Sequence, residues 1–508
     1  MKEEIEPYIT ASICEVTTDE PLPAQEININ KANLNNQQVR AFDGICQWAK
    51  KKHGLGVAVL IGYAGTGKTY TVQRIAKQLQ SERFKICFTA PTHKATHVLE
   101  SMASDADLNV TIMTIFKLLG LTIEHDHDGV TTINQNSESS AYKYDLIVVD
   151  ECSMIGSELF DYIPQNTDTK FLFMGDPCQL PPIDKKANQD ADNELPISPT
   201  FEISPQWHLT EVVRYDGAIF KYVTDIRENI EAAKLPLRKY NRRELEAMPS
   251  DEWETELCDR FKEVIADDSH PDKLRVLAWT NNRVQALNNL VRAEIYGANA
   301  KPYIKGERLI AKEIVKADFE IAQMMYDDIH DLDWKERRWE TGNSYTLMNS
   351  CAECTVESAT QSSVTFFDSS VWNVWELVVE TDLGDVATVN ILDISEKEHC
   401  SKYFGGWKKQ ILDIPNTTPE YRKTRKAEWA KFYQHLDLLC LKPQGNGFIR
   451  KLQYAFALTI HQSQGSTFET VFADVSNVYG CKDIKLRNQL LYVQGSRASK
   501  ELILLSKY

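Results

Sequence analysis

The feature that most constrains the fold is a glycine-rich segment, Gly62-Tyr-Ala-Gly-Thr-Gly-Lys-Thr69, which fits G-x-x-x-x-G-K-[ST]. The apolar residues 57–61 precede it and predict a buried strand. Apolar residues then recur at helical spacing from Val72 to Leu79, which predicts a helix that begins where the segment ends. A strand, a glycine loop and a helix in this order indicate a parallel α/β sheet with a phosphate site at the helix N-terminus.

The residue types in this segment suit a nucleotide. Glycines let backbone N–H groups surround the phosphates, Lys68 would reach the β- and γ-phosphates, and the Thr69 hydroxyl would ligate Mg²⁺. The alternative, a chance glycine turn before a core helix, does not account for both flanks. The expected nucleotide contacts are Gly62, Ala64, Gly65, Thr66, Gly67, Lys68, Thr69 and Tyr70.

A second segment, residues 145–151, predicts the catalytic carboxylates. Its apolar run forms a strand that carries Asp150 and Glu151 at its C-terminal end, where open α/β sheets bind ligands. We expect Asp150 to hold Mg²⁺, directly or through water, and Glu151 to polarise the attacking water. Together with the glycine-rich segment, this strand predicts an enzyme that hydrolyses a nucleoside triphosphate with Mg²⁺.

The composition excludes several classes of protein. The chain has 508 residues, a formal charge of −16 and 43% hydrophobic residues, as globular proteins do. Its longest clean apolar run is far shorter than the roughly 20 residues of a membrane span. Eleven scattered cysteines argue against a disulfide framework and favour a reducing, cytoplasmic setting. The net negative charge does not exclude a protein that binds nucleic acid, because a local basic channel is enough to bind it.

Two segments interrupt the alternation of strands and helices. Residues 121–136 read as two short β runs around the turn signal His127-Asp-Gly129. Residues 310–452 hold six of the ten tryptophans, which predicts a β-rich inserted domain with its own core.

Four further segments carry a family resemblance. In chain order they are Thr89-Ala-Pro-Thr-His-Lys-Ala95, Gly175-Asp-Pro-Cys-Gln-Leu-Pro-Pro-Ile183, Thr459-Ile-His-Gln-Ser-Gln-Gly465 and Tyr492-Val-Gln-Gly-Ser-Arg-Ala498. They resemble the motifs of superfamily 1 helicases, and the Gly-Asp-x-x-Gln-Leu-Pro-Pro form is typical of the RecD-like and Dda-like, or 1B, branch. The resemblance covers residues 34–215, 275–309 and 452–508.

This resemblance implies an α/β fold with two RecA-like parallel-sheet lobes, a small β-hairpin insertion and a larger β-rich, SH3-like inserted domain. The expected division is an N-terminal arm at 1–33, lobe 1 at 34–113 and 144–212, the hairpin insertion at 114–143, lobe 2 at 213–309 and 453–508, and the inserted domain at 310–452.

The resemblance also implies roles around ATP. Gln38 would read the adenine, Gln179 would sense the γ-phosphate, and Gly465 would approach the nucleotide from lobe 2. Arg214 and Arg497 would neutralise charge in the transition state, a task that suits a fixed guanidinium. The sequence leaves open a solvated helix glutamine for Gln38 and a surface salt bridge for each arginine.

Short hydroxyl and amide side chains suit DNA-phosphate contacts that form and break at each step. For Phe116 the sequence leaves both base stacking and core packing open. The hairpin is equally compatible with a strand-separating pin and with an ordinary surface hairpin. The DNA contacts implied by position are Pro91, Thr92, His93, Lys94, Phe116, Thr280, Asn281, Thr459 and His461.

The resulting hypothesis is an ATP-dependent DNA helicase that moves 5′→3′ on single-stranded DNA and unwinds forked or tailed duplexes. It would act as a monomer in replication, repair or recombination, with partner proteins of those pathways, and in the bacterial cytoplasm if a phage encodes it. Gln462 replaces the usual lysine, Thr467 a common acidic residue and Gly495 a branched residue. These departures keep a second hypothesis open, a nucleotide-gated single-strand clamp or recruiting subunit that does not separate strands.

Overall fold

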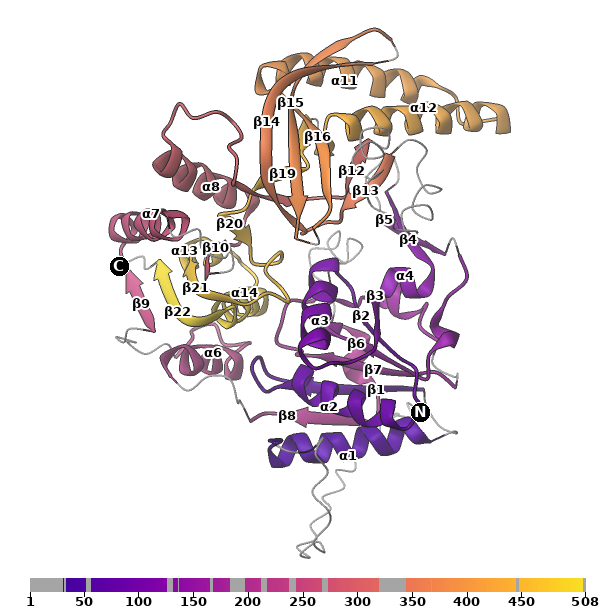
Figure 1. Cartoon of the computed structure of the whole chain (residues 1–508), viewed down its shortest axis with the longest axis vertical. Coiled ribbons are helices and arrows are strands. Elements are labelled where there is room, and N and C mark those ends of the chain that lie inside the picture. The colour runs from indigo at the N-terminus through magenta and orange to yellow at the C-terminus, as the bar shows by residue number, and fades with distance from the viewer. Residues whose placement is uncertain are drawn as a thin grey trace, which may run out of the picture.

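The computed structural model describes residues 31, 33–51, 56–125, 131–135, 137–164, 168–182, 197–211, 217–236, 244–266, 273–318, 344–366, 368–382, 384–444 and 447–505. Two parallel sheets lie beside each other, and an antiparallel sheet with two long helices lies against them (Figure 1). This arrangement confirms the predicted fold class.

Lobe 1 is a six-stranded parallel sheet in the order β3-β2-β6-β7-β1-β8. Ala58 and Leu60 pack under helices on one face, while Val57 and Val59 pack into a second core on the other. The strands are therefore apolar throughout, as buried parallel strands are. They are β1 (Val57–Gly62), β2 (Ile86–Ala90), β3 (Thr111–Thr114), β6 (Leu146–Val149), β7 (Lys170–Gly175) and β8 (Gln206–Leu209). The helices are α1 (Asn36–Lys50), α2 (Lys68–Ser81) and α3 (His93–Asp105) on the first face, and α4 (Ile115–Leu119) and α5 (Ser157–Phe160) on the second.

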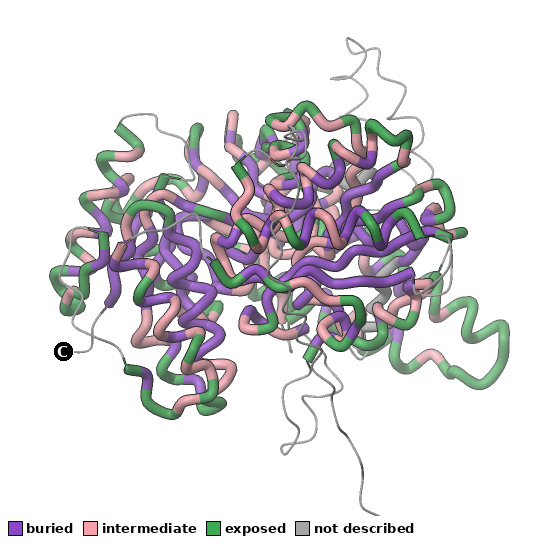
Figure 2. The backbone as a smooth tube through the Cα atoms, turned by 90° about the horizontal axis from the view of Figure 1, so that it is seen from below, coloured by how far each residue is buried: buried purple, intermediate pink, exposed green. Residues whose placement is uncertain are grey.

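Lobe 2 repeats this plan with five parallel strands in the order β20-β10-β21-β22-β9. Both faces are again covered, so the strands follow buried paths through the molecule (Figure 2). The strands are β9 (Leu245–Met248), β10 (Leu274–Ala278), β20 (Ala457–Thr459), β21 (Phe468–Ala473) and β22 (Ala498–Leu505). The helices are α7 (Ser250–Ala266) and α8 (Asn281–Tyr296) on one face, and α6 (Ala218–Glu228), α13 (Val475–Val478) and α14 (Ile484–Ser496) on the other.

The inserted domain is an antiparallel sheet in the order β16-β15-β14-β11-β19. Its first and last strands extend two residues beyond the predicted limits of 310 and 452. Two short hairpins, β12 (Val315–Asp318) with β13 (Ser344–Met348) and β17 (Leu441–Gln444) with β18 (Gly447–Arg450), flank the sheet. The sheet strands are β11 (Arg308–Ala311), β14 (Glu353–Thr365), β15 (Val371–Thr381), β16 (Val386–Leu392) and β19 (Leu452–Tyr454).

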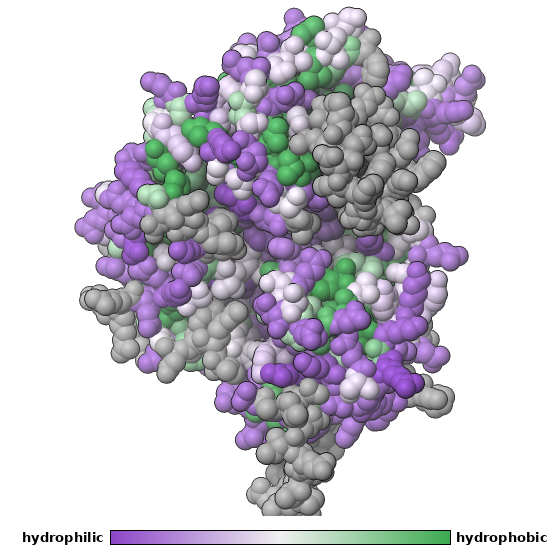
Figure 3. All heavy atoms as spheres, viewed as in Figure 1, coloured by the Kyte–Doolittle hydropathy of each residue, from purple (hydrophilic) through white to green (hydrophobic). Residues whose placement is uncertain are grey.

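Two long helices, α11 (Lys397–Asp413) and α12 (Pro419–Leu438), cross this sheet and complete an aromatic core around Trp372, Phe404 and Phe432. Of the six predicted tryptophans, Trp372, Trp407 and Trp429 lie in this mixed helix and strand layer and Trp375 lies in the core of the sheet, while Trp334 and Trp339 lie outside the described residues. Among the described residues, no helix is long and apolar enough to cross a membrane. Hydrophilic residues cover most of the face seen in Figure 3, and apolar residues gather there in separate patches.

The predicted hairpin insertion is present as β4 (Leu121–His125) paired antiparallel with β5 (Thr131–Gln135). Its turn residues 126–130 lie outside the described residues. Three described bonds anchor the hairpin strands to lobe 1. The Ile133 N–H donates to the Glu158 carboxylate (3.3 Å), the Tyr162 hydroxyl donates to the Ile133 carbonyl (3.0 Å), and the Gln135 amide donates to the Leu119 carbonyl (3.3 Å). Its use as a strand-separating pin stays a prediction.

One buried carboxylate joins all three parts of the chain. Glu353, the first residue of β14, accepts from Arg275 on β10 (2.5 Å), from Lys94 on α3 (3.2 Å) and from Arg308 on β11 (3.3 Å). Its side chain is only 4% exposed. Burial alone would raise the pKa of Glu353, but Arg275, followed by Lys94 and Arg308, lowers it to about 2. The carboxylate therefore stays ionised, and it is a fixed junction of lobe 1, lobe 2 and the inserted domain.

Glu353→Gln should destabilise the folded chain by about 3 kcal/mol, because it leaves buried cations without their shared anion. Since the pKa of Glu353 lies below its ordinary value of 4.5, the stabilisation is complete above that pH and is lost as pH falls toward about 2. Chemical denaturation at several pH values measures this. The two proteins should differ at pH 7 and converge in acid. Glu380→Gln, the same change at an exposed position of β15, is the control. Equal stability of Glu353→Gln and wild type at pH 7 would contradict the assignment.

Candidate nucleotide and nucleic-acid sites

The glycine-rich segment forms a loop that only glycine permits. Gly65 and Gly67 have left-handed φ values of 80° and 75°. A Cβ on Gly67 would lie 2.6 Å from the Gln38 amide nitrogen, and one on Gly62 would lie 2.7 Å from the Thr66 hydroxyl. Gly67 is the N-cap of α2 and supplies no side-chain cap, so the first-turn N–H groups of α2 suit an anion. The loop fits the phosphates of a nucleotide.

Lys68 lies folded over this loop. Its ammonium donates to the carbonyls of Gly62 (2.8 Å) and Tyr63 (3.1 Å), while the Thr66 hydroxyl donates to the Tyr63 carbonyl (2.9 Å). Neutral carbonyls hold the ammonium in place without cancelling its charge. The loop and Lys68 therefore present a positioned cation beside the uncapped helix end.

The predicted carboxylates lie at the same sheet edge, because β6, β7 and β1 are neighbours and all run parallel. Asp150 accepts the Glu151 N–H (2.8 Å), and Glu151 turns the chain with a left-handed φ of 50°, which is uncommon outside glycine. Burial, and next the Glu151 carboxylate, raises the pKa of Asp150 to about 7, against the opposing effect of Lys68. A cation would favour the ionised form, so Asp150 fits a Mg²⁺ ligand with Thr69.

Gln38 braces the loop from α1. It is only 3% exposed, which excludes the solvated alternative. Its amide oxygen accepts the Asn35 N–H (3.0 Å) in a capping box, and its amide nitrogen donates to the Thr66 carbonyl (3.0 Å). Its contact with adenine stays a prediction.

A polar relay links the loop to lobe 2. The Ala64 N–H donates to the Tyr492 hydroxyl (3.0 Å), which donates to the fully buried Asp176 carboxylate (2.5 Å). The Arg227 guanidinium of α6 donates to both oxygens of Asp176 (3.0 and 3.3 Å) and lies 3.3 Å from the centre of the Tyr63 ring. The relay therefore passes from lobe 1 to α14 and α6 of lobe 2 through groups that are all paired.

The remaining predicted nucleotide residues lie at this lobe boundary. The Gln489 amide donates to the Gln179 carbonyl (2.9 Å), and the Gln179 side-chain oxygen is buried without a partner among the described residues. A Cβ on Gly465 would lie 3.5 Å from the Ala95 side chain of α3. These positions are compatible with a ligand-dependent contact, and their nucleotide roles stay predictions.

Arg497 is buried, and its guanidinium donates within lobe 2, to the carbonyls of Val493 (3.3 Å) and Ser466 (3.2 Å) and to the Ser496 hydroxyl (3.0 Å). The surface salt bridge considered from the sequence is therefore wrong for Arg497. Its role toward ATP stays a prediction. Arg214 lies outside the described residues.

A groove of about 980 Å³ lies between lobe 2 and the inserted domain. Thr280, Asn281, Thr459 and His461, four of the residues predicted to contact DNA, all line it. Burial lowers the pKa of His461, which favours its neutral form. The structure thus brings together residues from two distant segments of the sequence.

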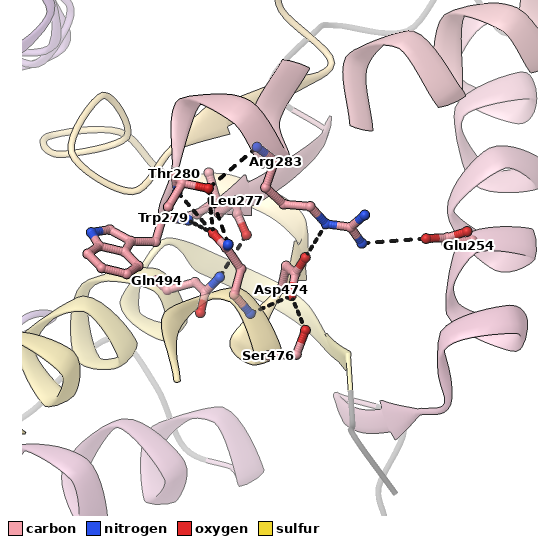
Figure 4. A network of polar contacts seen from close by, with 9 residues as sticks. Glu254, Leu277, Trp279, Thr280, Arg283, Asp474, Ser476 and Gln494 are labelled. Carbon is pink, nitrogen blue, oxygen red and sulfur yellow. Dashed lines mark hydrogen bonds and ion pairs between the residues drawn. The ribbon is translucent and has the colours of Figure 1, made fainter. Parts of the chain in front are cut away.

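A network of polar contacts fixes the lobe 2 side of this groove (Figure 4). The Thr280 hydroxyl caps α8 by accepting the Arg283 N–H (3.4 Å), and the Asn477 side-chain oxygen accepts the N–H groups of Trp279 and Thr280 (2.9 Å each). The Arg283 guanidinium donates to the buried Asp474 (2.6 Å). Trp279, which also lines the groove, is therefore held on a rigid support.

The other predicted DNA residues, Pro91, Thr92, His93, Lys94 and Phe116, belong to lobe 1 and are not among those that line this groove. Thr92 caps α3 by accepting the Ala95 N–H (3.3 Å). The Lys94 ammonium forms an ion pair with Glu353. The half-buried Phe116 packs against the core of lobe 1. Their DNA contacts stay predictions.

The sequence interpretation missed several of these residues. Tyr492 and Asp176 stand in motifs that it used, but spacing does not show that they touch. Arg227 and Glu353 lie outside any motif, and only the packing of separate elements reveals them. Trp279 was not predicted as a DNA contact, but it directly precedes Thr280 and Asn281, which were, so its neighbours in the sequence could have indicated its place on the groove.

The sequence is similar to known proteins along most of its length. Residues 48–185 match the family described as AAA domain, and residues 454–505 match UvrD-like helicase C-terminal domain. An uncharacterised protein of Acanthamoeba polyphaga mimivirus is 25% identical over 491 residues, covering 87% of this chain and 94% of its own. The ATP-dependent DNA helicase dda of Enterobacteria phage T4 is 25% identical over 480 residues, and the alignment covers 92% of this chain and 97% of the phage protein. A solved Pif1 helicase from Bacteroides, in complex with ADP-AlF3 and single-stranded DNA, has 15% identity and a TM-score of 0.47, with 92% of each chain covered.

Tyr492→Phe should loosen the contact between the lobes, because it leaves the Ala64 N–H without an acceptor and removes one donor from Asp176. An unsatisfied buried group costs about 1–3 kcal/mol, so amide exchange of the loop should speed up by about tenfold or more. Hydrogen exchange followed by mass spectrometry measures this. Tyr421→Phe, which removes an exposed hydroxyl, is the control. Unchanged protection of the loop in Tyr492→Phe would argue against the relay.

Proposed function

Since the chain belongs to the superfamily 1B helicases, we propose that it is an ATP-dependent DNA helicase that moves 5′→3′ along single-stranded DNA and unwinds duplex DNA. The observation that carries the proposal is the relay from Ala64 through Tyr492 and Asp176 to Arg227. It ties the phosphate loop of one lobe to the lobe that lines the groove. The phage T4 relative is named an ATP-dependent DNA helicase.

In this proposal the loop binds the triphosphate through its N–H groups and through Lys68. Thr69 and Asp150 would hold Mg²⁺, which neutralises phosphate charge when bound. Glu151, one residue beyond Asp150, orients the attacking water and accepts its proton. The unpartnered oxygen of Gln179 supports a role for this residue as a sensor, because a buried polar atom needs a partner that ligand or water supplies.

Movement would come from the two lobes. Arg497 and Arg214 would stabilise the charge of the transferring phosphoryl group from the lobe 2 side of the cleft. Arg497 has to exchange its present carbonyl partners for that role, which requires lobe 2 to shift. The relay keeps the lobes coupled during such a shift. Closing and opening would then step the strand along the groove.

The strand would lie in the groove between lobe 2 and the inserted domain. Asn281, Thr459 and His461 offer polar groups to its backbone, and Trp279 offers an aromatic face for a base. Pro91, Thr92 and His93 would continue the path on lobe 1, and the β4–β5 hairpin would meet the duplex. Stacking and phosphate contacts of this kind do not depend on base sequence.

A second candidate is a nucleotide-gated clamp on single-stranded DNA. Glu353 favours it, since a junction that fixes the inserted domain to both lobes limits how far they separate. Such a clamp would bind the strand and hydrolyse ATP without separating a duplex.

Lys68→Ala should lower ATP hydrolysis by about a hundredfold or more, because it removes the cation that faces the β- and γ-phosphates. Single-strand binding should remain, because the groove is built by other elements. Phosphate release and fluorescence anisotropy of a labelled oligonucleotide measure the two activities. Lys77→Ala, an exposed lysine on the same helix, is the control. A folded Lys68→Ala protein that loses both activities equally would count against separate sites.

The wild-type chain should unwind a duplex with a 5′ single-stranded tail and leave a 3′-tailed duplex intact. Gel separation of labelled strands with ATP and Mg²⁺ measures this. Glu151→Gln should bind ATP and DNA but unwind neither substrate. Unwinding of the 3′-tailed duplex alone would refute the direction. ATP hydrolysis without unwinding of either duplex would select the clamp.

A further inference from the structure

Lys312 brings a cation from the inserted domain into the groove. It follows β11, and its backbone N–H donates to the Lys451 carbonyl (2.7 Å), which fixes its position. Its ammonium crosses to lobe 2, where it donates to the side-chain oxygen of Gln462 (2.7 Å) and lies 3.5 Å from that of Asn281. All three side chains line the groove. Lys312 is therefore partly buried at the place where the two parts face each other.

This ammonium lacks an anion. Both of its acceptors are neutral amides, and within the described part of the chain no carboxylate lies within ion-pair distance of it. Burial, and then the nearby Lys442, lowers the pKa of Lys312 to about 8, against the opposing effect of Cys351. Lys442 itself is paired with Glu313 (2.7 Å). The protein thus holds a desolvated cation and leaves it without a counter-charge.

Buried Arg497 also donates only to neutral oxygens, but three other buried cations of this chain each have a carboxylate partner. Arg275 is paired with Glu353, Arg292 with Glu307 (2.6 Å), and Lys451 with Asp437. An unpaired buried charge is costly, so such charges are paired unless a ligand completes them. Lys312 differs from these three cations in two ways: it has no carboxylate partner among the described residues, and it lines the groove.

The rest of the groove favours an anion as that partner. Lys397, Lys442 and Arg450 line it on the inserted-domain side. The one carboxylate among the described lining residues, Asp393, accepts from the Trp375 indole N–H (2.7 Å) and the Ser395 hydroxyl (2.8 Å). The groove thus carries net positive charge in a chain whose formal charge is −16.

We propose that Lys312, with the amides of Gln462 and Asn281, forms a phosphate subsite through which the inserted domain holds the backbone of the bound single strand. The subsite rests on the proposed function, since it takes a phosphodiester of the strand that lies in the groove. The inserted domain is then part of the strand-binding surface, and a bound phosphate bridges it to lobe 2.

The test is binding of labelled oligothymidylate by fluorescence anisotropy at several NaCl concentrations, with wild type and Lys312→Gln. Loss of a charged contact should weaken binding about tenfold at low salt. It should also reduce the slope of log affinity against log salt by about 0.7, the value for one contact with a single strand. Lys305→Gln, an exposed lysine paired with Glu357, should keep the wild-type slope.

A charge exchange separates this role from a merely structural one. Because the ends of Lys312 and Gln462 touch, Lys312→Gln combined with Gln462→Lys returns a cation to nearly the same place. The double variant should recover most of the affinity and the wild-type slope. A structural lysine would not be rescued in this way.

The pH dependence gives a second readout. A bound phosphate raises the pKa of Lys312, so wild-type affinity should be full below about pH 8 and fall as pH rises beyond it. Lys312→Arg, which stays charged, should show a flatter profile. The Cys351 thiol and Lys442, the other titratable groups that act on Lys312, are unchanged in that comparison.

The outcomes are distinct. If wild type binds but Lys312→Gln keeps its affinity and slope, the subsite is wrong and the proposed function stands. If wild type does not bind the oligonucleotide, the proposed function itself fails. Titration with inorganic phosphate alone completes the test: binding that wild type shows and Lys312→Gln loses would identify a free-anion site and overturn the strand assignment.

Discussion

The carboxylate of Glu353 sets the geometry on which the other sites depend. It lies at the start of an inserted strand, yet its partners Arg275 and Lys94 belong to the two lobes. A charge so deeply buried is tolerated only with cations around it, so the three parts are held in one arrangement. The groove beside lobe 2 is lined by residues from the parts of the chain that this junction joins.

In the proposed function, the relay would couple the phosphate loop to lobe 2, and the groove would hold the strand. Tyr492 and Asp176 connect the phosphate loop to α14 and α6, so a change at the loop reaches the framework of lobe 2 directly. The network around Asp474 and Arg283 then ties β21 to the start of α8, where Trp279 faces the groove. Each link is a hydrogen bond or an ion pair between buried or half-buried groups, which makes the path stiff. Stiff links transmit a shift that a loose contact would absorb.

Local chemistry made much of the nucleotide site predictable. Lys68 and the glycines must adjoin one another in the chain, since a loop around phosphates is a local structure, and Asp150 must follow an apolar strand. The inserted domain was predicted only in part. Its tryptophans indicated a separate core, but the packing of α11 and α12 around Trp372 depends on contacts between segments that lie far apart in the sequence. The surface salt bridge that the sequence left open for Arg497 is excluded because the side chain is buried and its carbonyl partners, Val493 of α14 and Ser466 before β21, are brought together only by packing.

The sequence by itself determined the phosphate loop, the strand that carries Asp150 and the motifs whose family resemblance implied two parallel-sheet lobes, because these features depend on neighbouring residues and on short-range periodicity. The tertiary structure alone decided which distant groups meet. Lys94, chosen from its motif as a DNA contact, is paired with Glu353 some 259 positions away, while Lys312 reaches Gln462 without any motif. Spacing along a chain contains no information on such pairs, since the energy of a buried charge depends on the groups that folding places around it.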